Sequence, residues 1–132
     1  TLGDKDKDVR KEVAGALGKI GAKDAVRPLV AALGDKDKDV RKAVVDALGK
    51  MGAKEAVRPL IAALGDRDKD VREAAAYVLG LMKTKEAARP LMAALKDEHW
   101  QVRSAAAEAL KKITGENLGE DYGRWLDWWR RR

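Results

Sequence analysis

The stretch GDKDKDVR occupies residues 3–10 and returns letter for letter at residues 34–41. At residues 65–72 it returns once more as GDRDKDVR. The stretch begins with glycine and alternates aspartate with basic residues, a composition that favours a turn leading into a helix. Its return at a fixed interval indicates that most of the chain is built from repeats.

The interval of the repeat is 31 residues. Arginine keeps it at four positions, Arg10, Arg41, Arg72 and Arg103, and proline keeps it at Pro28, Pro59 and Pro90. We therefore divide one domain, residues 1–132, into repeat units 2–32, 33–63, 64–94 and 95–115 and a tail at 116–132. The first two units differ at only 6 of 31 positions, which indicates recent duplication or deliberate design.

Each unit contains two amphipathic segments. In DVRKEVAGALGKI (8–20), apolar residues at helical spacing form one stripe, and Gly21 follows as a stop signal. The segment KDAVRPLVAAL (23–33) is the second helix, in which we expect Pro28 to cause a kink because it lies past the first turn. Neither helix can bury its stripe alone, so the pattern predicts an all-α protein in which stacked helix pairs form an α-solenoid.

The pattern AVRPLVAALGDKDKDVRKAVVDALGKMG (25–52) resembles the short HEAT-like repeats of the bilin-lyase type, and designed proteins built on that repeat are similar. The resemblance extends from residue 2 to about residue 113. It implies a right-handed superhelix of helix pairs whose DVR-type helices line the concave face, the usual binding face of this family. It also implies that the aspartates and arginines of the repeat form a ladder along the solenoid.

The aspartate-rich turn has two alternative interpretations. An EF-hand calcium loop counted from Asp4 needs glycine at its sixth position and glutamate at its twelfth, where this chain has Val9 and Gly15. We therefore favour the structural interpretation, in which Asp6 caps the following helix. The ladder then comprises aspartates and arginines six residues apart within each unit: Asp4 and Arg10, Asp35 and Arg41, Asp66 and Arg72, Asp97 and Arg103.

The concave face carries the candidate binding residues. With the apolar stripes turned inward, we expect partner contacts from Lys11, Lys19, Lys42, Asp46, Lys50, Glu73, Tyr77, Leu81, Trp100, Glu108 and Lys112. An exposed tyrosine, leucine and tryptophan near one another would anchor a partner. The alternative is that Leu81 packs under a neighbour and that Trp100 shields the last helix. We interpret His99 as a surface turn residue.

The tail GEDYGRWLDWWRRR (119–132) departs from the repeat. Three tryptophans share one face of a short helix, Trp125, Trp128 and Trp129. A solenoid needs an atypical end to cover its last stripe, so we expect these residues to form a C-terminal capping helix. The alternative is a membrane-surface or nucleic-acid contact that also uses the terminal arginines.

The amino-acid composition excludes several classes of function. The chain has no cysteine, so a disulfide framework and a thiolate metal site are both excluded, and we expect a cytoplasmic location. No apolar run approaches the ~20 residues of a membrane span. The sequence shows no glycine-rich phosphate loop, nucleophile–histidine pair or metal-ligand cluster. We therefore assign no catalytic, cofactor-binding or metal-binding residue and expect a protein that is not an enzyme.

Three functions are ranked on these grounds. The first is a protein-binding scaffold that uses the concave face. The second is nucleic-acid binding through concave-face lysines, which the net charge of +6 favours and the interspersed carboxylates disfavour. The third, a bilin-lyase-like subunit, follows only from the resemblance. The chain opens inside a unit, so the stripe of Val9, Val13 and Leu17 lacks cover, and we also expect self-association or fraying at that end.

Overall fold

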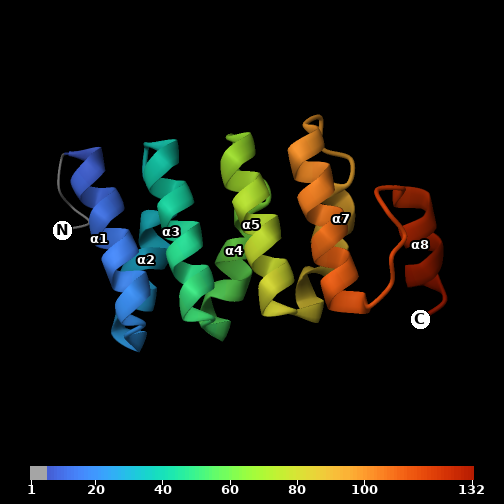
Figure 1. Cartoon of the computed structure of the whole chain (residues 1–132), viewed down its shortest axis with the longest axis horizontal. Helices are drawn as coiled ribbons and strands as arrows, with labels where there is room; N and C mark the ends of the chain where they lie inside the picture. Colours follow the sequence, from blue (N-terminus) through green and yellow to red (C-terminus); the bar gives the residue numbers. More distant parts are fainter. Residues whose placement is uncertain (1–5) are drawn as a thin grey trace.

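The computed structural model describes residues 6–132, and the regular elements of this part are all helical (Figure 1). Long helices lie side by side in one layer: α1 (Lys7–Ile20), α3 (Lys38–Met51), α5 (Lys69–Met82) and α7 (Trp100–Thr114). Shorter helices form a second layer, and each packs against the long helix that follows it: α2 (Val26–Ala32), α4 (Val57–Ala63) and α6 (Ala88–Ala94). The prediction of an all-α solenoid is confirmed.

The aspartate-rich turns begin the long helices as expected. The carboxylate of Asp6 accepts a hydrogen bond from the backbone N–H of Asp8 at 2.9 Å, and Asp37 and Asp68 cap α3 and α5 in the same way. Gly21 ends α1 in the left-handed conformation with φ 68°. Lys83 occupies the corresponding position after α5 with φ 51°, a conformation that glycine adopts at lower cost.

The predicted kink at Pro28 is wrong. The segment begins with one turn of 3-10 helix, η1 (Lys23–Ala25), and α2 starts only at Val26. Pro28 is therefore the third residue of α2, within the first turn, where the backbone N–H groups have no partner inside the helix. Proline here removes no hydrogen bond from the helix, and the same arrangement returns with η2 (Lys54–Ala56) and η3 (Lys85–Ala87).

The core lies between the two layers. Its largest aliphatic side chains are leucines that are fully buried at equivalent positions: Leu29, Leu60 and Leu91 from the short helices, and Leu48, Leu79 and Leu110 from the long ones. Glycine permits close approach between neighbouring long helices. A Cβ atom at Gly80 would lie 2.8 Å from the Cα atom of Ala109 in α7, so α5 and α7 are in backbone contact there.

The first long helix is covered less completely than its equivalents. Val9, Val13 and Leu17 of α1 are half-buried, and Ile20 is 71% exposed. Their counterparts Val40, Val44 and Leu48 in α3 are fully buried. The stripe expected to lack cover at the start of the solenoid is therefore only partly covered among the described residues.

The tail forms α8 (Tyr122–Arg130), which packs against α6 at the end of the stack (Figure 1). Trp125 is fully buried, and its indole N–H donates to the carbonyl of Gly119 at 2.8 Å. Trp128 and Trp129 are half-buried against the same core, and the rings of Trp125 and Trp128 meet edge to face at 5.9 Å. These contacts place all three tryptophans on a helix that packs against the core at the C-terminal end of the stack.

Candidate functional site

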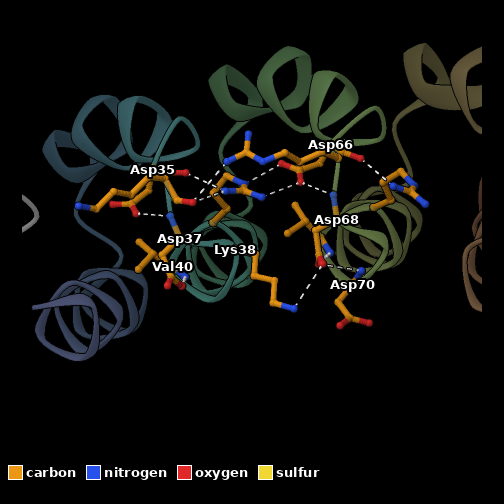
Figure 2. A network of polar contacts seen from close by, with 12 residues as sticks. Asp35, Asp37, Lys38, Val40, Asp66, Asp68 and Asp70 are labelled. Atoms are coloured by element: carbon orange, nitrogen blue, oxygen red, sulfur yellow. Dashed lines mark hydrogen bonds and ion pairs between the residues drawn. The ribbon is translucent and has the colours of Figure 1, made fainter.

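The turns between the layers are joined by a ladder of arginines and aspartates (Figure 2). Arg10 donates to Asp35, Arg41 to Asp66 and Arg72 to Asp97, each through Nε and Nη2 at 2.7–3.2 Å. Each pair spans 25 residues and links one unit to the next. Because both nitrogens of the fork bind one carboxylate, the contact fixes the orientation of adjacent units.

The six-residue pairing expected from the sequence takes a different form. Arg41 Nη1 donates to the backbone carbonyl of Asp35 at 2.8 Å, whereas its carboxylate partner is Asp66. Arg103 likewise donates to the carbonyl of Asp97 at 2.8 Å and lies 3.5 Å from Glu120 Oε1. Asp4 lies outside the described residues.

The ladder also affects the pKa of two of its carboxylates, those of Asp35 and Asp97. For Asp35, partial burial would raise the pKa, but the hydrogen bonds from Arg10 and the backbone N–H of Asp37 lower it, as do the charges of Arg10 and Lys36. The net effect holds the pKa of Asp35 below its ordinary value. The pKa of Asp97 is lowered by the same balance, with Arg72 and His99 as the partners.

The exposed face of the long-helix layer carries a groove over α3, α5 and α7. Its volume is about 560 Å³. Side chains predicted as binding residues line it at seven positions: Lys42, Asp46, Glu73, Tyr77, Trp100, Glu108 and Lys112. The structure therefore brings most of the expected set together on three adjacent helices.

Two aromatic side chains of the groove are open to solvent. Tyr77 from α5 is 56% exposed, and Trp100 at the start of α7 is 67% exposed. The ammonium of Lys112 lies 5.2 Å from the ring centroid of Tyr77, a cation–π contact. The alternative in which Trp100 shields the last helix is wrong, because its side chain remains largely exposed to solvent.

One carboxylate of the groove has a perturbed affinity for protons. Asp46 is exposed on α3, yet desolvation by the surrounding protein raises its pKa above the ordinary value, and the nearby charges of Lys42 and Lys50 lower it in part. The charged form of Asp46 is therefore less well solvated than that of a fully exposed aspartate.

The remaining predicted residues lie elsewhere. Leu81 is 52% exposed, so the alternative in which it packs under a neighbour is also wrong. It lines a second depression at the far end of α5, together with Met82 and Thr84. Lys11, Lys19 and Lys50 are exposed on α1 and α3 but do not line the groove.

The sequence interpretation missed two polar residues of the groove, Asp70 and Gln101. Asp70 falls three residues before Glu73, and Gln101 falls seven before Glu108, so helical periodicity places each on the exposed face of its helix. The spacing was a sufficient signal in both cases.

Within residues 6–132, no group of three or more histidine, cysteine or acidic side chains is arranged to hold a metal ion. In the same part of the chain, no helix has both the length and the apolar character needed to cross a bilayer. His99 precedes α7 in the turn where it was expected, 3.6 Å from Glu98.

Two solved structures share this architecture. The complex of CpcE and CpcF of phycocyanin lyase from Nostoc sp. PCC7120 matches with a TM-score of 0.69 at 28% identity, covering 95% of this chain and 65% of that chain. An engineered protein matches with a TM-score of 0.61 at 24% identity, covering 85% of this chain and 59% of that chain. The chain thus spans less than two thirds of the length of either structure.

Comparison with curated protein sequences found no match. A family model described as HEAT repeats matches residues 1–66 and 57–120. With the phycocyanin-lyase complex, this match confirms the resemblance to HEAT-like repeats of the bilin-lyase type, and the engineered protein shares the fold. The chain belongs to the HEAT-repeat family.

Proposed function

We propose that this protein is a non-catalytic scaffold that binds a protein partner in the groove over α3, α5 and α7. HEAT repeats generally mediate interactions between proteins, and solenoids present extended surfaces for this purpose. The observation that carries the proposal is the exposure of Tyr77 and Trp100 in a single groove. Aromatic side chains dominate binding energy at protein interfaces, because they bury a large area with few rotatable bonds.

The walls of the groove support the same function. Backbone contact at Gly80 holds α5 against α7, and the arginine–aspartate ladder fixes the turns that begin both helices. A partner would therefore meet helices whose relative positions are already fixed. Preorganisation of this kind lowers the entropic cost of association.

A selection experiment tests the proposal. Peptides enriched on the wild-type protein from a displayed library of random sequences are expected to lose affinity for the double variant Tyr77→Ala/Trp100→Ala. The matched control is Ile20→Ala, which removes an exposed apolar side chain outside the groove. Enrichment of no peptide, or binding that is indifferent to the double variant, would contradict the proposed function.

A bilin-lyase-like subunit is the second candidate, and the likeness to the phycocyanin-lyase complex favours it. In that case the chain would act together with another subunit on a phycobiliprotein. Attachment of a bilin to a phycobiliprotein subunit, assayed by absorbance with and without this chain, tests the idea. An unchanged yield of attached bilin would remove it.

Nucleic-acid binding is the third candidate, because Lys11, Lys19, Lys42 and Lys50 are exposed on two adjacent helices. Such binding rests on contacts to phosphates and falls steeply with salt. The fluorescence anisotropy of a labelled generic duplex, measured at roughly 50 and 200 mM salt, tests nucleic-acid binding. Tight binding that collapses at the higher salt would establish this function, and no binding at either salt would exclude it.

We also propose that the incompletely covered face of α1 promotes pairing with a second copy or fraying of that end. The half-burial of Val13 and Leu17 and the exposure of Ile20 support this. Light scattering over a concentration series is expected to show association that Ile20→Glu weakens, or else amide exchange is faster in α1 than in α5. A monomer at all concentrations, with equal protection in both helices, would contradict the proposal.

A further inference from the structure

The groove has a charge opposite to that of the whole protein. The chain carries a formal net charge of +6. The groove is lined by four carboxylates, Asp46, Asp70, Glu73 and Glu108, but by only two ammonium groups, those of Lys42 and Lys112. Its local potential therefore favours cations, although the surrounding surface favours anions.

The groove carboxylates differ from those of the ladder in their partners. Asp35, Asp66 and Asp97 each bind an arginine at 2.7–2.9 Å. Among the described residues, none of the four groove carboxylates forms an ion pair within 4.0 Å. In Figure 2 the carboxylate of Asp70 points away from the ladder that lies beside it. These groups are available to a cation from another molecule.

Trp100 provides an independent indication of the same chemistry. The other tryptophans contact a ring or a cation: Trp125 and Trp128 pair with each other, and Arg89 lies 5.9 Å from the ring of Trp129. Within residues 6–132, no cation or aromatic ring is stacked on Trp100. Tryptophan is the strongest cation–π acceptor among the side chains, and Lys112 over Tyr77 shows that a ring of this groove already accepts an ammonium group.

We propose that the groove binds a protein segment that presents lysine or arginine side chains, with a cation stacked on Trp100 and others facing the carboxylates of α3, α5 and α7. The proposal rests on the proposed function and specifies the chemistry of the partner. Charge complementarity selects this occupant over an acidic segment, which would face four like charges without a compensating cluster of lysines.

The environment of Asp46 supports the proposal. Asp46 is exposed in the groove, and desolvation by the surrounding protein raises its pKa, which the charges of Lys42 and Lys50 offset only in part. A cation supplied by the partner would stabilise the charged form of this group directly. The same cation would be attracted by Glu73 and Glu108 on the two following helices.

Three labelled peptides of equal length serve as probes, each alternating leucine with one polar residue: arginine, glutamine or glutamate. Fluorescence anisotropy at moderate salt measures their affinity for the wild-type protein. The arginine peptide is expected to bind most tightly and the glutamate peptide most weakly. Nuclear magnetic resonance of the same complex is expected to show that the indole N–H signal of Trp100 shifts on addition of the arginine peptide.

Two charge-neutralising variants make the test specific. Glu73→Gln/Glu108→Gln removes two groove charges and is expected to weaken binding of the arginine peptide by roughly three- to thirtyfold, as two exposed charge pairs would. Glu55→Gln/Glu116→Gln removes two exposed charges outside this groove and is expected to change affinity by less than about twofold. Equal loss in both variants would mean that only the overall charge of the protein attracts the peptide, and would overturn the proposal.

Failure of this inference is distinguishable from failure of the proposed function. Equal affinity for the glutamine and arginine peptides, with both lost in Tyr77→Ala/Trp100→Ala, would overturn the basic partner but retain a protein-binding groove. Absence of binding by the arginine peptide would also overturn the inference. The peptide selection described above then decides separately whether the groove binds any protein segment.

Discussion

Arg41 donates from Nε to Asp66 Oδ2 at 2.9 Å, so a side chain in α3 binds the turn that precedes α5. The same guanidinium donates from Nη1 to the carbonyl of Asp35 at 2.8 Å. One buried arginine therefore ties together the turns of two successive repeats. The repetition of this contact at Arg10 and Arg72 keeps the long helices in a common register, on which the groove depends.

Arg41→Ala is expected to lower the free energy of unfolding by about 3 kcal/mol, because Asp66 would keep a partly buried charge without its partner. Urea denaturation measures the change. Lys42→Ala, at the neighbouring exposed position, is the control and is expected to change stability by less than about 0.5 kcal/mol. Equal effects of the two substitutions would show that the ladder is not a determinant of stability.

The ladder also predicts a dependence of stability on pH. The pKa of Asp97 is lowered in the folded state, so its contribution is present above about pH 4 and is lost as the pH falls through the folded value. The free energy of unfolding of wild type minus that of Asp97→Asn should therefore shrink between about pH 6 and about pH 3. Denaturation of both proteins across this range provides the measurement, and a constant difference would contradict the account.

Gly80→Ala is expected to destabilise the protein by about 1–3 kcal/mol, because the new Cβ atom would meet the backbone of Ala109. Gly15→Ala is the matched change in another long helix, where the new Cβ would meet no atom of a neighbouring helix within 4 Å. It is expected to raise stability by up to about 1 kcal/mol through helix propensity. Thermal unfolding compares the two variants, and stabilisation by both would refute the close contact between α5 and α7.

Trp125→Ala is expected to lower the free energy of unfolding by about 3–5 kcal/mol, since it empties a fully buried site in the capping helix. Trp100→Ala, which removes an exposed tryptophan, is expected to change stability by less than about 1 kcal/mol. Urea denaturation of both variants tests whether Trp125 stabilises the fold and whether Trp100 is dispensable for stability. The reverse order of effects would mean that the roles of the two tryptophans are exchanged.

The fold was predictable because the aspartate-rich turns, the arginines and the prolines all recur with a period of 31 residues. The carboxylate partner of each ladder arginine was not predictable. Asp35 and Asp66 are equivalent positions of the repeat, and Arg41 contacts both of these residues. Only the stacking of units shows which carboxylate the guanidinium reaches. The prediction of a kink at Pro28 was wrong because a 3-10 turn precedes α2, which therefore begins only at Val26. Helix propensities do not locate such a boundary to within a few residues.

The groove was predictable in part. Tyr77 and Trp100 were singled out because they interrupt a repeat of charged residues, and the structure exposes both in one groove. Leu81 was grouped with them, but it lies one helical turn beyond Tyr77, at the end of α5. The excess of carboxylates over ammonium groups in the groove includes Asp70, whose side chain shares the exposed face of α5 with Glu73. This excess becomes apparent only when the residues of the neighbouring helices are counted together.

Binding of a peptide selected on the wild-type protein, measured by anisotropy against the stable variant Trp100→Ala, tests the central claim most directly. If the groove is the binding site, the loss of this exposed ring is expected to weaken binding by about thirtyfold or more, the effect of a residue that contributes about 2 kcal/mol to an interface. Unchanged affinity would contradict the claim and move the binding surface away from the groove.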